Sequence, residues 1–300
     1  MNNTGWDMMR VATAPINWNN DDLPELRPTM PVDQVLAEMA RAGYEGTEYG
    51  TGFPTESQAL RRVLSRHGLS LASCFCFLSL EEQRSHAEEI ARAVSVARIL
   101  ADAGVQELIL GLRGTPERLA LAGRVPPDGS AGLTERQWRT MAGGIHALAA
   151  ACEPLQVRVS VHPHAGSFLE TREEIEQFLF YTDETAVGVC VDAGHLVYGG
   201  ADPVEVVRSC GARVRYIHLK DVNASVLGAS RRERWSFLEA LKHYVFCDLG
   251  CGCVDLAHFV DALRSIAFNG WMVIEEDTSP DPPFLAAQRN RHYLQERLGV

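Results

Sequence analysis

The chain has 300 residues, of which 46% are hydrophobic and 22% are charged, a composition typical of one globular domain spanning residues 1–300. Its 28 basic and 39 acidic residues give a net charge of -11. This acidic balance disfavours nucleic acid and anionic membrane surfaces as partners.

The start of the chain and its cysteines both indicate a cytoplasmic protein. Residues 1–18 lack the apolar stretch of a secretory signal, and no later run reaches the ~20 apolar residues of a membrane span. The eight cysteines are scattered, so we expect reduced and mostly structural thiols. Cys247, Cys251 and Cys253 lie close together, but their spacing matches none of the usual zinc-binding pairs.

The first part of the chain alternates between short apolar runs, typical of buried strands, and amphipathic segments that end at glycine, typical of helices. The polar loop that follows the first strand is too long for a simple connector, which indicates a functional loop. We expect strands at residues 11–15, 47–49, 69–77 and 106–111, and helices at residues 32–42, 57–68 and 82–103.

The second part continues the same alternation. Residues 113–132 are rich in Gly and Pro and predict a loop or lid with one short helical turn. Thr134 and Gln137 have the spacing of a capping box at the start of the next helix. We expect strands at residues 158–162, 187–191, 214–219 and 271–277, and helices at residues 133–153, 172–181, 203–210 and 254–270.

Strict alternation of strand and helix demands parallel strands joined by right-handed crossovers. The first strand-to-helix turn lacks the G-x-G-x-x-G pattern of a doubly wound sheet, and polar side chains recur at the ends of four different strands. A closed barrel brings all of these ends to one rim. The sequence therefore predicts an α/β fold, a (β/α)8 TIM barrel.

Two apolar runs end abruptly in residues that bind metals or move protons. Asp192 and His195 follow the first run, and His218, Lys220 and Asp221 follow the second. If Asp192 and His218 face the barrel axis, strand alternation places Cys190 beneath the first, and Tyr216 and Val214 beneath the second. The alternative for each motif is a capped strand end and a core histidine.

We expect one divalent metal ion at this rim, because four strand ends each supply an imidazole or a carboxylate. Such mixed ligands suit Mn, Co, Zn or Fe better than Ca or Mg. A rim of salt bridges without metal is the alternative, and Glu276 should point away from the axis if Glu275 points inward. The expected ligands are His162, Asp192, His218 and Glu275.

The motifs V-D-A-G-H, I-H-L-K-D and G-W-M-V-I-E resemble the xylose isomerase-like, or sugar phosphate isomerase/epimerase, TIM-barrel superfamily. The first loop, A-P-I-N-W-N-N-D-D, and the G-T-E of the second strand are similar to those of its inosose dehydratase branch. This resemblance implies metal-dependent dehydration of a 2-keto-inositol through a metal-stabilised enolate, in inositol catabolism, with Mn or Co favoured. One departure is His162, which stands where most isomerases and epimerases of the superfamily carry a Glu.

The reaction implied by the resemblance needs groups that move protons and groups that hold a polyol. Glu48, His164, His195 and Lys220 are the candidates for proton transfer, and the sequence does not decide which is base and which is acid. Carboxamides and carboxylates pair hydroxyls and an indole packs on a ring, although turn formation and rim packing are the alternative roles. The expected substrate-binding residues are Asn17, Trp18, Asn20 and Asp21.

Two other function classes stay open. A keto-sugar isomerase or epimerase can use the same scaffold, and so can a barrel that binds a ligand without turnover. Endonuclease activity is a poorer alternative because the chain is acidic and has no basic clusters. In each enzymatic case the partner is a small keto-polyol or keto-sugar, and the oligomeric state, a homo-oligomer included, stays open.

Overall fold

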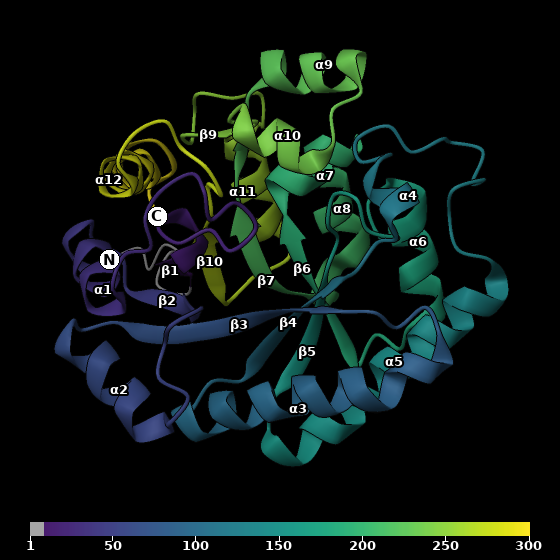
Figure 1. Cartoon of the computed structure of the whole chain (residues 1–300), viewed down its shortest axis with the longest axis horizontal. Coiled ribbons are helices and arrows are strands. Elements are labelled where there is room, and N and C mark those ends of the chain that lie inside the picture. The colour runs from purple at the N-terminus through teal and green to yellow at the C-terminus, as the bar shows by residue number, and fades with distance from the viewer. Residues whose placement is uncertain (1–8) are drawn as a thin grey trace.

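The computed structural model describes residues 9–300; residues 1–8, part of the segment in which we expected no secretory signal, lie outside it. Eight parallel strands form a closed barrel in the order β1-β10-β7-β6-β5-β4-β3-β2, which confirms the predicted TIM barrel (Figure 1). The barrel strands are β1 (Arg10–Thr13), β2 (Gly46–Tyr49), β3 (Ser70–Leu78), β4 (Glu107–Leu112), β5 (Arg158–His162), β6 (Val187–Asp192), β7 (Val214–Leu219) and β10 (Trp271–Ile274).

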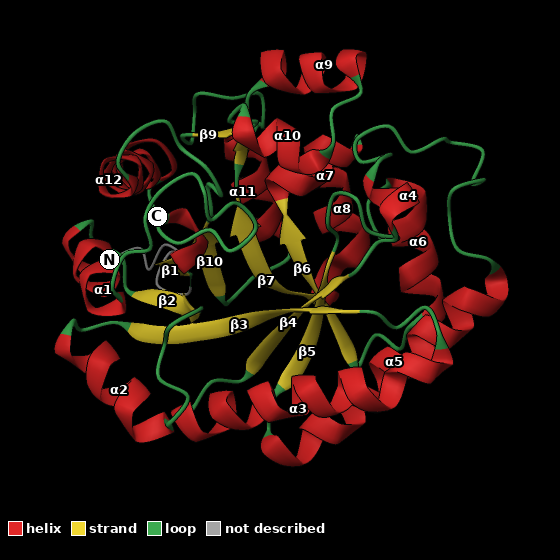
Figure 2. Cartoon of the chain, viewed as in Figure 1, coloured by secondary structure: helices red, strands yellow, loops and turns green. Residues whose placement is uncertain are grey.

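Helices surround the barrel, and none within residues 9–300 is long and apolar enough to cross a membrane (Figure 2). The helices are α1 (Val32–Arg41), α2 (Ser57–Arg66), α3 (His86–Ala103), α4 (Pro116–Leu119), α5 (Glu135–Cys152), α6 (Arg172–Tyr181), α7 (Ala193–Gly199), α8 (Pro203–Cys210), α9 (Ala224–Glu233), α10 (Phe237–Lys242), α11 (Leu256–Ser265) and α12 (Pro283–Tyr293). Short 3-10 turns lie at Pro15–Asn17, Gln83–Ser85, Glu153–Leu155 and Gly211–Arg213, and a π-helical turn at Leu294–Leu298.

Local sequence signals explain where several helices begin and end. Thr134 and Gln137 form the predicted capping box at the start of α5. Helix α3 ends at Gly104, whose φ of 80° is easily adopted only by a residue without a side chain. The short helix α4 is the helical turn expected within residues 113–132.

Other elements differ from the sequence predictions. Helix α11 stops at Ser265 rather than continuing to Gly270, because Ala267 turns the chain with a left-handed φ of 53°. The helices α7, α9, α10 and α12 were not predicted. A two-stranded antiparallel sheet was also missed, formed by β8 (Asp221–Val222) and β9 (Phe246–Cys247).

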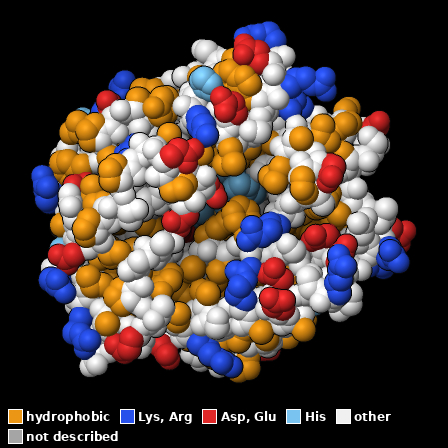
Figure 3. Space-filling model, viewed as in Figure 1, with side chains coloured by type: hydrophobic (Ala, Val, Ile, Leu, Met, Phe, Trp, Pro, Cys, Tyr) orange, Lys and Arg blue, Asp and Glu red, His pale blue; other side chains and the backbone are white. Residues whose placement is uncertain are grey.

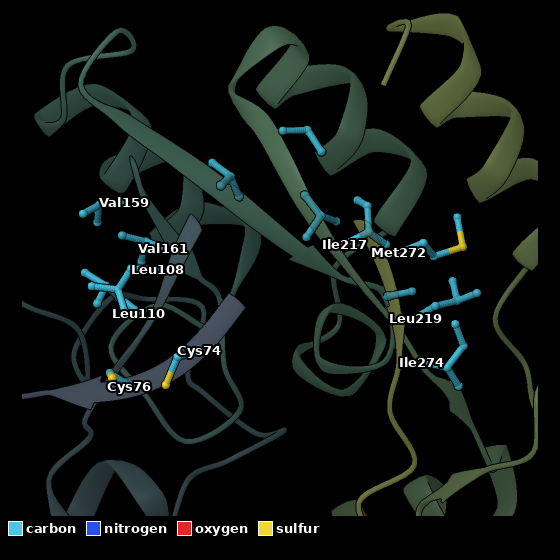
Figure 4. Packing of buried hydrophobic residues seen from close by; sticks show 14 of the residues in the cluster. Cys74, Cys76, Leu108, Leu110, Val159, Val161, Ile217, Leu219, Met272 and Ile274 are labelled. Atoms are coloured by element: carbon cyan, nitrogen blue, oxygen red, sulfur yellow. The ribbon is translucent and has the colours of Figure 1, made fainter. Parts of the chain in front are cut away.

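Two apolar layers hold the barrel together. The larger one lies between strands and helices, where alternate side chains of β3, β4, β5, β7 and β10 point outward (Figure 4). The smaller one fills the barrel interior and contains Ala12, Ala72, Ile109, Cys190, Tyr216 and Val273. Cys190 and Tyr216 therefore lie inside, as expected, whereas Val214 packs in the outer layer, and a shift in strand register explains this difference.

A buried arginine attaches the segment 113–132 to the barrel. Arg118 is 1% exposed, and its Nη2 donates to Glu174 Oε2 at 2.7 Å while its Nε donates to the Ser167 carbonyl at 2.6 Å. Glu174 also accepts from the backbone N–H of Thr171 in the capping box of α6. Because both charges are buried, loss of one partner leaves the other unpaired.

We therefore expect Arg118→Ala to lower the free energy of unfolding by about 3 kcal/mol. The matched control is Arg139→Ala, which removes an exposed ion pair with Glu135 and should cost less than about 1 kcal/mol. Chemical denaturation of both variants measures the difference. Equal stability of the two variants would contradict the anchoring role of Arg118.

Candidate active site

The carboxyl ends of the barrel strands surround a cavity of about 510 Å³. Figure 3 shows histidine atoms at the bottom of a hollow in this face of the molecule. All four candidates for proton transfer line the cavity, together with two of the expected metal ligands, and the other two, Asp192 and His218, are buried beside them. The six residues of these two sets that line the cavity are Glu48, His162, His164, His195, Lys220 and Glu275.

The four expected metal ligands form one chain of contacts across β5, β6, β7 and the end of β10. His162 Nε2 lies 3.2 Å from Asp192 Oδ2, and His218 Nδ1 lies 3.7 Å from the same oxygen. His218 Nδ1 also lies 3.2 Å from Glu275 Oε2. Asp192 is held in place because its Oδ1 accepts the backbone N–H of His195 and caps α7.

These side chains fit a divalent cation by two observations. The Nδ1 atom of His162 is buried without a hydrogen-bond partner, which is unusual for a polar atom. Three buried triads, each with two of the four expected ligands and one further residue, also have ligand atoms within 4.8 Å of one another. The triads are His162, Asp192 and His195; Glu48, His218 and Glu275; and His162, Cys190 and His218.

Lys220 supplies positive charge to this cluster. Its Nζ lies 2.7 Å from Glu275, 2.9 Å from Asp277 and 3.5 Å from Asp192, and the side chain is 2% exposed. Burial opposes the charged form, but the carboxylates of Asp277 and Glu275 raise the pKa of Lys220 well above its ordinary value. In turn, His218 and Lys220 outweigh burial and hold the pKa of Glu275 well below its ordinary value.

His218 is under the same influence from two carboxylates. Burial again opposes the charged form, but Glu275 and Glu48 raise the pKa of His218 well above its ordinary value. A histidine must be deprotonated to bind a metal, so a bound cation would take the place of the imidazole proton as the counter-charge.

His164 and His195 pack against each other with their ring centroids 4.0 Å apart, and the backbone of one residue, Ala165, contacts a ring nitrogen of each. The Ala165 carbonyl accepts from His164 Nδ1 at 2.9 Å, and the Ala165 N–H donates to His195 Nδ1 at 3.1 Å. Burial lowers the pKa of His164 to about 3 and that of His195 well below its ordinary value. Both rings are therefore neutral, and His164 keeps its Nε2 as an acceptor.

Glu48, at the inner face of β2, is 3% exposed and held by two donors. Its Oε1 accepts from Ser73 Oγ at 2.7 Å and lies 3.1 Å from His218 Nε2. Ser73 and Asp277 are site residues that the sequence prediction missed. Asp277 lies in the predicted acidic end of the last strand, whereas no sequence pattern identifies Ser73.

In the first loop, three of the four expected substrate-binding residues make contacts within the protein instead of facing the cavity. Trp18 is fully buried and donates from Nε1 to Glu38 at 2.7 Å. Asn17 hydrogen-bonds the backbone of Ile274 and Glu276, and Asn20 that of Asp277. These three side chains do not line the cavity, which matches the alternative roles in turns and rim packing. Asp21 does line it, and hydrogen-bonds Thr51 there.

The fold and the cluster together define the class of this protein, a TIM barrel with a buried imidazole and carboxylate site at the carboxyl ends of its strands. Within this class, residues 36–297 match the model of the xylose isomerase-like TIM barrel family, and the chain belongs to this family. The resemblance seen in the sequence is thereby confirmed.

Several relatives are similar over nearly the whole chain. The chain is 35% identical to an inosose dehydratase of Geobacillus kaustophilus, over 95% of this chain and 93% of that protein. It is 28% identical to an inosose dehydratase of Clostridium beijerinckii, over 98% of each. It spans the full length of these relatives rather than one part of them.

Solved structures show the same fold at low sequence identity. A probable 3-DHS dehydratase, AsbF, from Bacillus anthracis superposes with a TM-score of 0.73 at 13% identity, covering 96% of this chain and 100% of that one. The IOLI protein, solved with a bound zinc atom, gives a TM-score of 0.70 at 16% identity, covering 96% and 97%.

We expect Asp192→Ala and His218→Ala each to abolish stoichiometric binding of a divalent metal, because each removes one of the proposed metal ligands at the centre of the cluster. Elemental analysis after dialysis against Mn²⁺, Co²⁺ or Zn²⁺ measures bound metal, and circular dichroism monitors folding. His258→Ala, which removes an exposed imidazole, is the control and should keep its metal. Unchanged metal content in both cluster variants would disprove the ligand set.

Proposed function

We propose that this protein is a hydro-lyase that removes water from a 2-keto-inositol with the help of one divalent metal ion. The observation that carries this proposal is the 35% identity to an inosose dehydratase over 95% of the chain. The buried cluster supports it, because a bound cation and separate proton-transfer groups both assist dehydration beside a ketone.

Under this proposal, His162, Asp192, His218 and Glu275 hold the ion. A divalent ion bound there acts as a Lewis acid on the keto group and makes the neighbouring C–H proton more acidic. Imidazole and carboxylate donors together suit Mn, Co, Zn or Fe, and metal analysis decides among them.

The remaining groups of the cavity divide the proton transfers between them. One base removes the proton from the carbon beside the ketone, and one acid delivers a proton to the hydroxyl group on the next carbon. The C–H and C–O bonds break, a carbon–carbon double bond forms and water leaves. Glu48, His164, His195 and Lys220, which line the cavity from different strand ends, are the candidates for the two transfers, in a syn or an anti elimination.

His162 favours a lyase over an epimerase. An epimerase removes a proton from one face of a carbon and returns it on the other, which two opposed glutamates can do. At position 162 the chain carries an imidazole, and burial lowers the pKa of His162 below its ordinary value. This side chain is therefore a metal ligand rather than a second proton carrier in the proposed reaction.

We expect the metal-loaded protein to convert 2-keto-myo-inositol into an unsaturated or diketone product that absorbs in the ultraviolet. Mass spectrometry should show the loss of one water, and removal of metal with a chelator should abolish it. A fructose control distinguishes the alternative class, because an isomerase or epimerase changes only the arrangement of atoms in its substrate. Loss of water from no keto-inositol would refute the proposal.

We expect Glu48→Gln to lower kcat by roughly 100-fold or more, the scale of a lost general acid or base. Metal content should stay unchanged, because the four proposed ligands are intact. Glu45→Gln, which alters an exposed side chain three residues earlier, is the control and should keep its activity. Full turnover by Glu48→Gln would move the proton-transfer role to the histidines or Lys220.

A further inference from the structure

We infer that Ser73 and Tyr216 form a buried hydrogen-bonded relay that positions Glu48 for proton transfer. The inference rests on the proposed function, since it gives Glu48 a role in that reaction. Ser73 and Tyr216 are both fully buried, and neither lines the cavity, although the Tyr216 ring packs edge-on against His218. Their role is therefore positioning rather than catalysis.

An irregularity in β3 brings Ser73 to Glu48. Thr47 of β2 pairs with Leu71, but Tyr49 pairs with Cys74, so two residues of β3 lie opposite the single residue Glu48. Such a bulge lets neighbouring side chains point to the same side of a strand. Ala72 packs in the barrel interior while Ser73 Oγ lies 2.7 Å from Glu48 Oε1.

A second irregularity lies in β7, directly before Tyr216. Val189 of β6 pairs with Val214, but the next residue, Cys190, pairs with Tyr216, so Arg215 is the extra residue. Tyr216 keeps the inward direction that alternation with His218 gives it, and its oxygen lies 2.9 Å from Ser73 Oγ. Side chains from opposite walls of the barrel thus meet at one hydroxyl group.

The chemistry of the three groups fixes the direction of the hydrogen bonds. An ionised carboxylate only accepts, so Ser73 uses its one proton for Glu48. The Tyr216 hydroxyl then has its own proton to donate to Ser73 Oγ, 2.9 Å away, or to Glu48, with which it also interacts directly. The bond from Ser73 and the contact with His218 both end on Oε1 of Glu48, so Oε2 is free of them and available to a substrate proton.

A double-mutant cycle of Ser73 and Tyr216 tests the relay. We expect Ser73→Ala to lower kcat by roughly 10- to 100-fold, because a misplaced base loses much of its rate advantage. Tyr216→Phe should lower kcat by less than about 10-fold, since Ser73 can still donate to Glu48. The double variant should lose less activity than the product of the two single effects, because Ser73 and Tyr216 both act on the same carboxylate.

Ser160→Ala is the matched control. Ser160 is also fully buried in a barrel strand and donates to a buried carboxylate, Glu107, at 3.2 Å, but it lies away from the cavity. It should keep its kcat despite a similar loss of stability. In the relay variants, KM and metal content should stay at the wild-type values, which a general disturbance of the barrel would not preserve.

A crystal structure of the Ser73→Ala variant tests the role of Ser73 without any substrate. The Glu48 carboxylate should leave the place it occupies beside His218. A carboxylate that stays there, wild-type kcat in Ser73→Ala, or simple multiplication of the two single effects would each overturn the relay. If the wild-type protein dehydrates no keto-inositol, the proposed function fails, and the position of Glu48 in the variant still decides whether Ser73 holds it.

Discussion

The structure of this site depends on the burial of four carboxylates within one small region of the barrel. Glu48, Asp192, Glu275 and Asp277 are each less than 10% exposed. A buried charge is tolerated only with partners, and the ammonium of Lys220 contacts three of these four. The direction of the pKa shift differs among Asp192, Glu275 and Asp277. Cationic neighbours outweigh burial at Asp192 and Glu275, whereas at Asp277 burial prevails and raises the pKa to about 6.

The barrel supplies this pairing because the carboxyl ends of parallel strands converge. Strands β5 and β6 end in His162 and Asp192, and β7 ends directly before Lys220. Along each strand, the inward-facing residue before the strand end lies one layer deeper in the barrel. Regular alternation alone, however, does not place every group. The bulge in β3 lets both Ala72 and Ser73 face inward, and the bulge at Arg215 turns Val214 outward, where strict alternation would not place them.

The same bulges explain how far the sequence could be interpreted. Apolar runs and glycine stops predict the eight strands and most of the surrounding helices, since burial and backbone freedom act locally. Residues at strand ends, such as His162 and Glu275, were found because the barrel brings those ends together. The inward position of Ser73 and the outward position of Val214 depend on the register between neighbouring strands. A single sequence does not specify this register. Helix α7 was missed because its glycine-rich sequence is typical of a loop, while the cap from Asp192 stabilises a helix.

The electrostatic consequence of His162 follows from the charges around it. With the proposed divalent ion bound, the four carboxylates and one ammonium would leave a single net negative charge, whereas a glutamate at position 162 would leave two. In the proposed dehydration, negative charge develops on the keto oxygen and on the departing hydroxyl group. An additional carboxylate would repel both in a buried site, where such interactions are strong. A neutral imidazole donates electrons to a metal without adding charge, so this substitution favours a reaction in which a negatively charged group must leave.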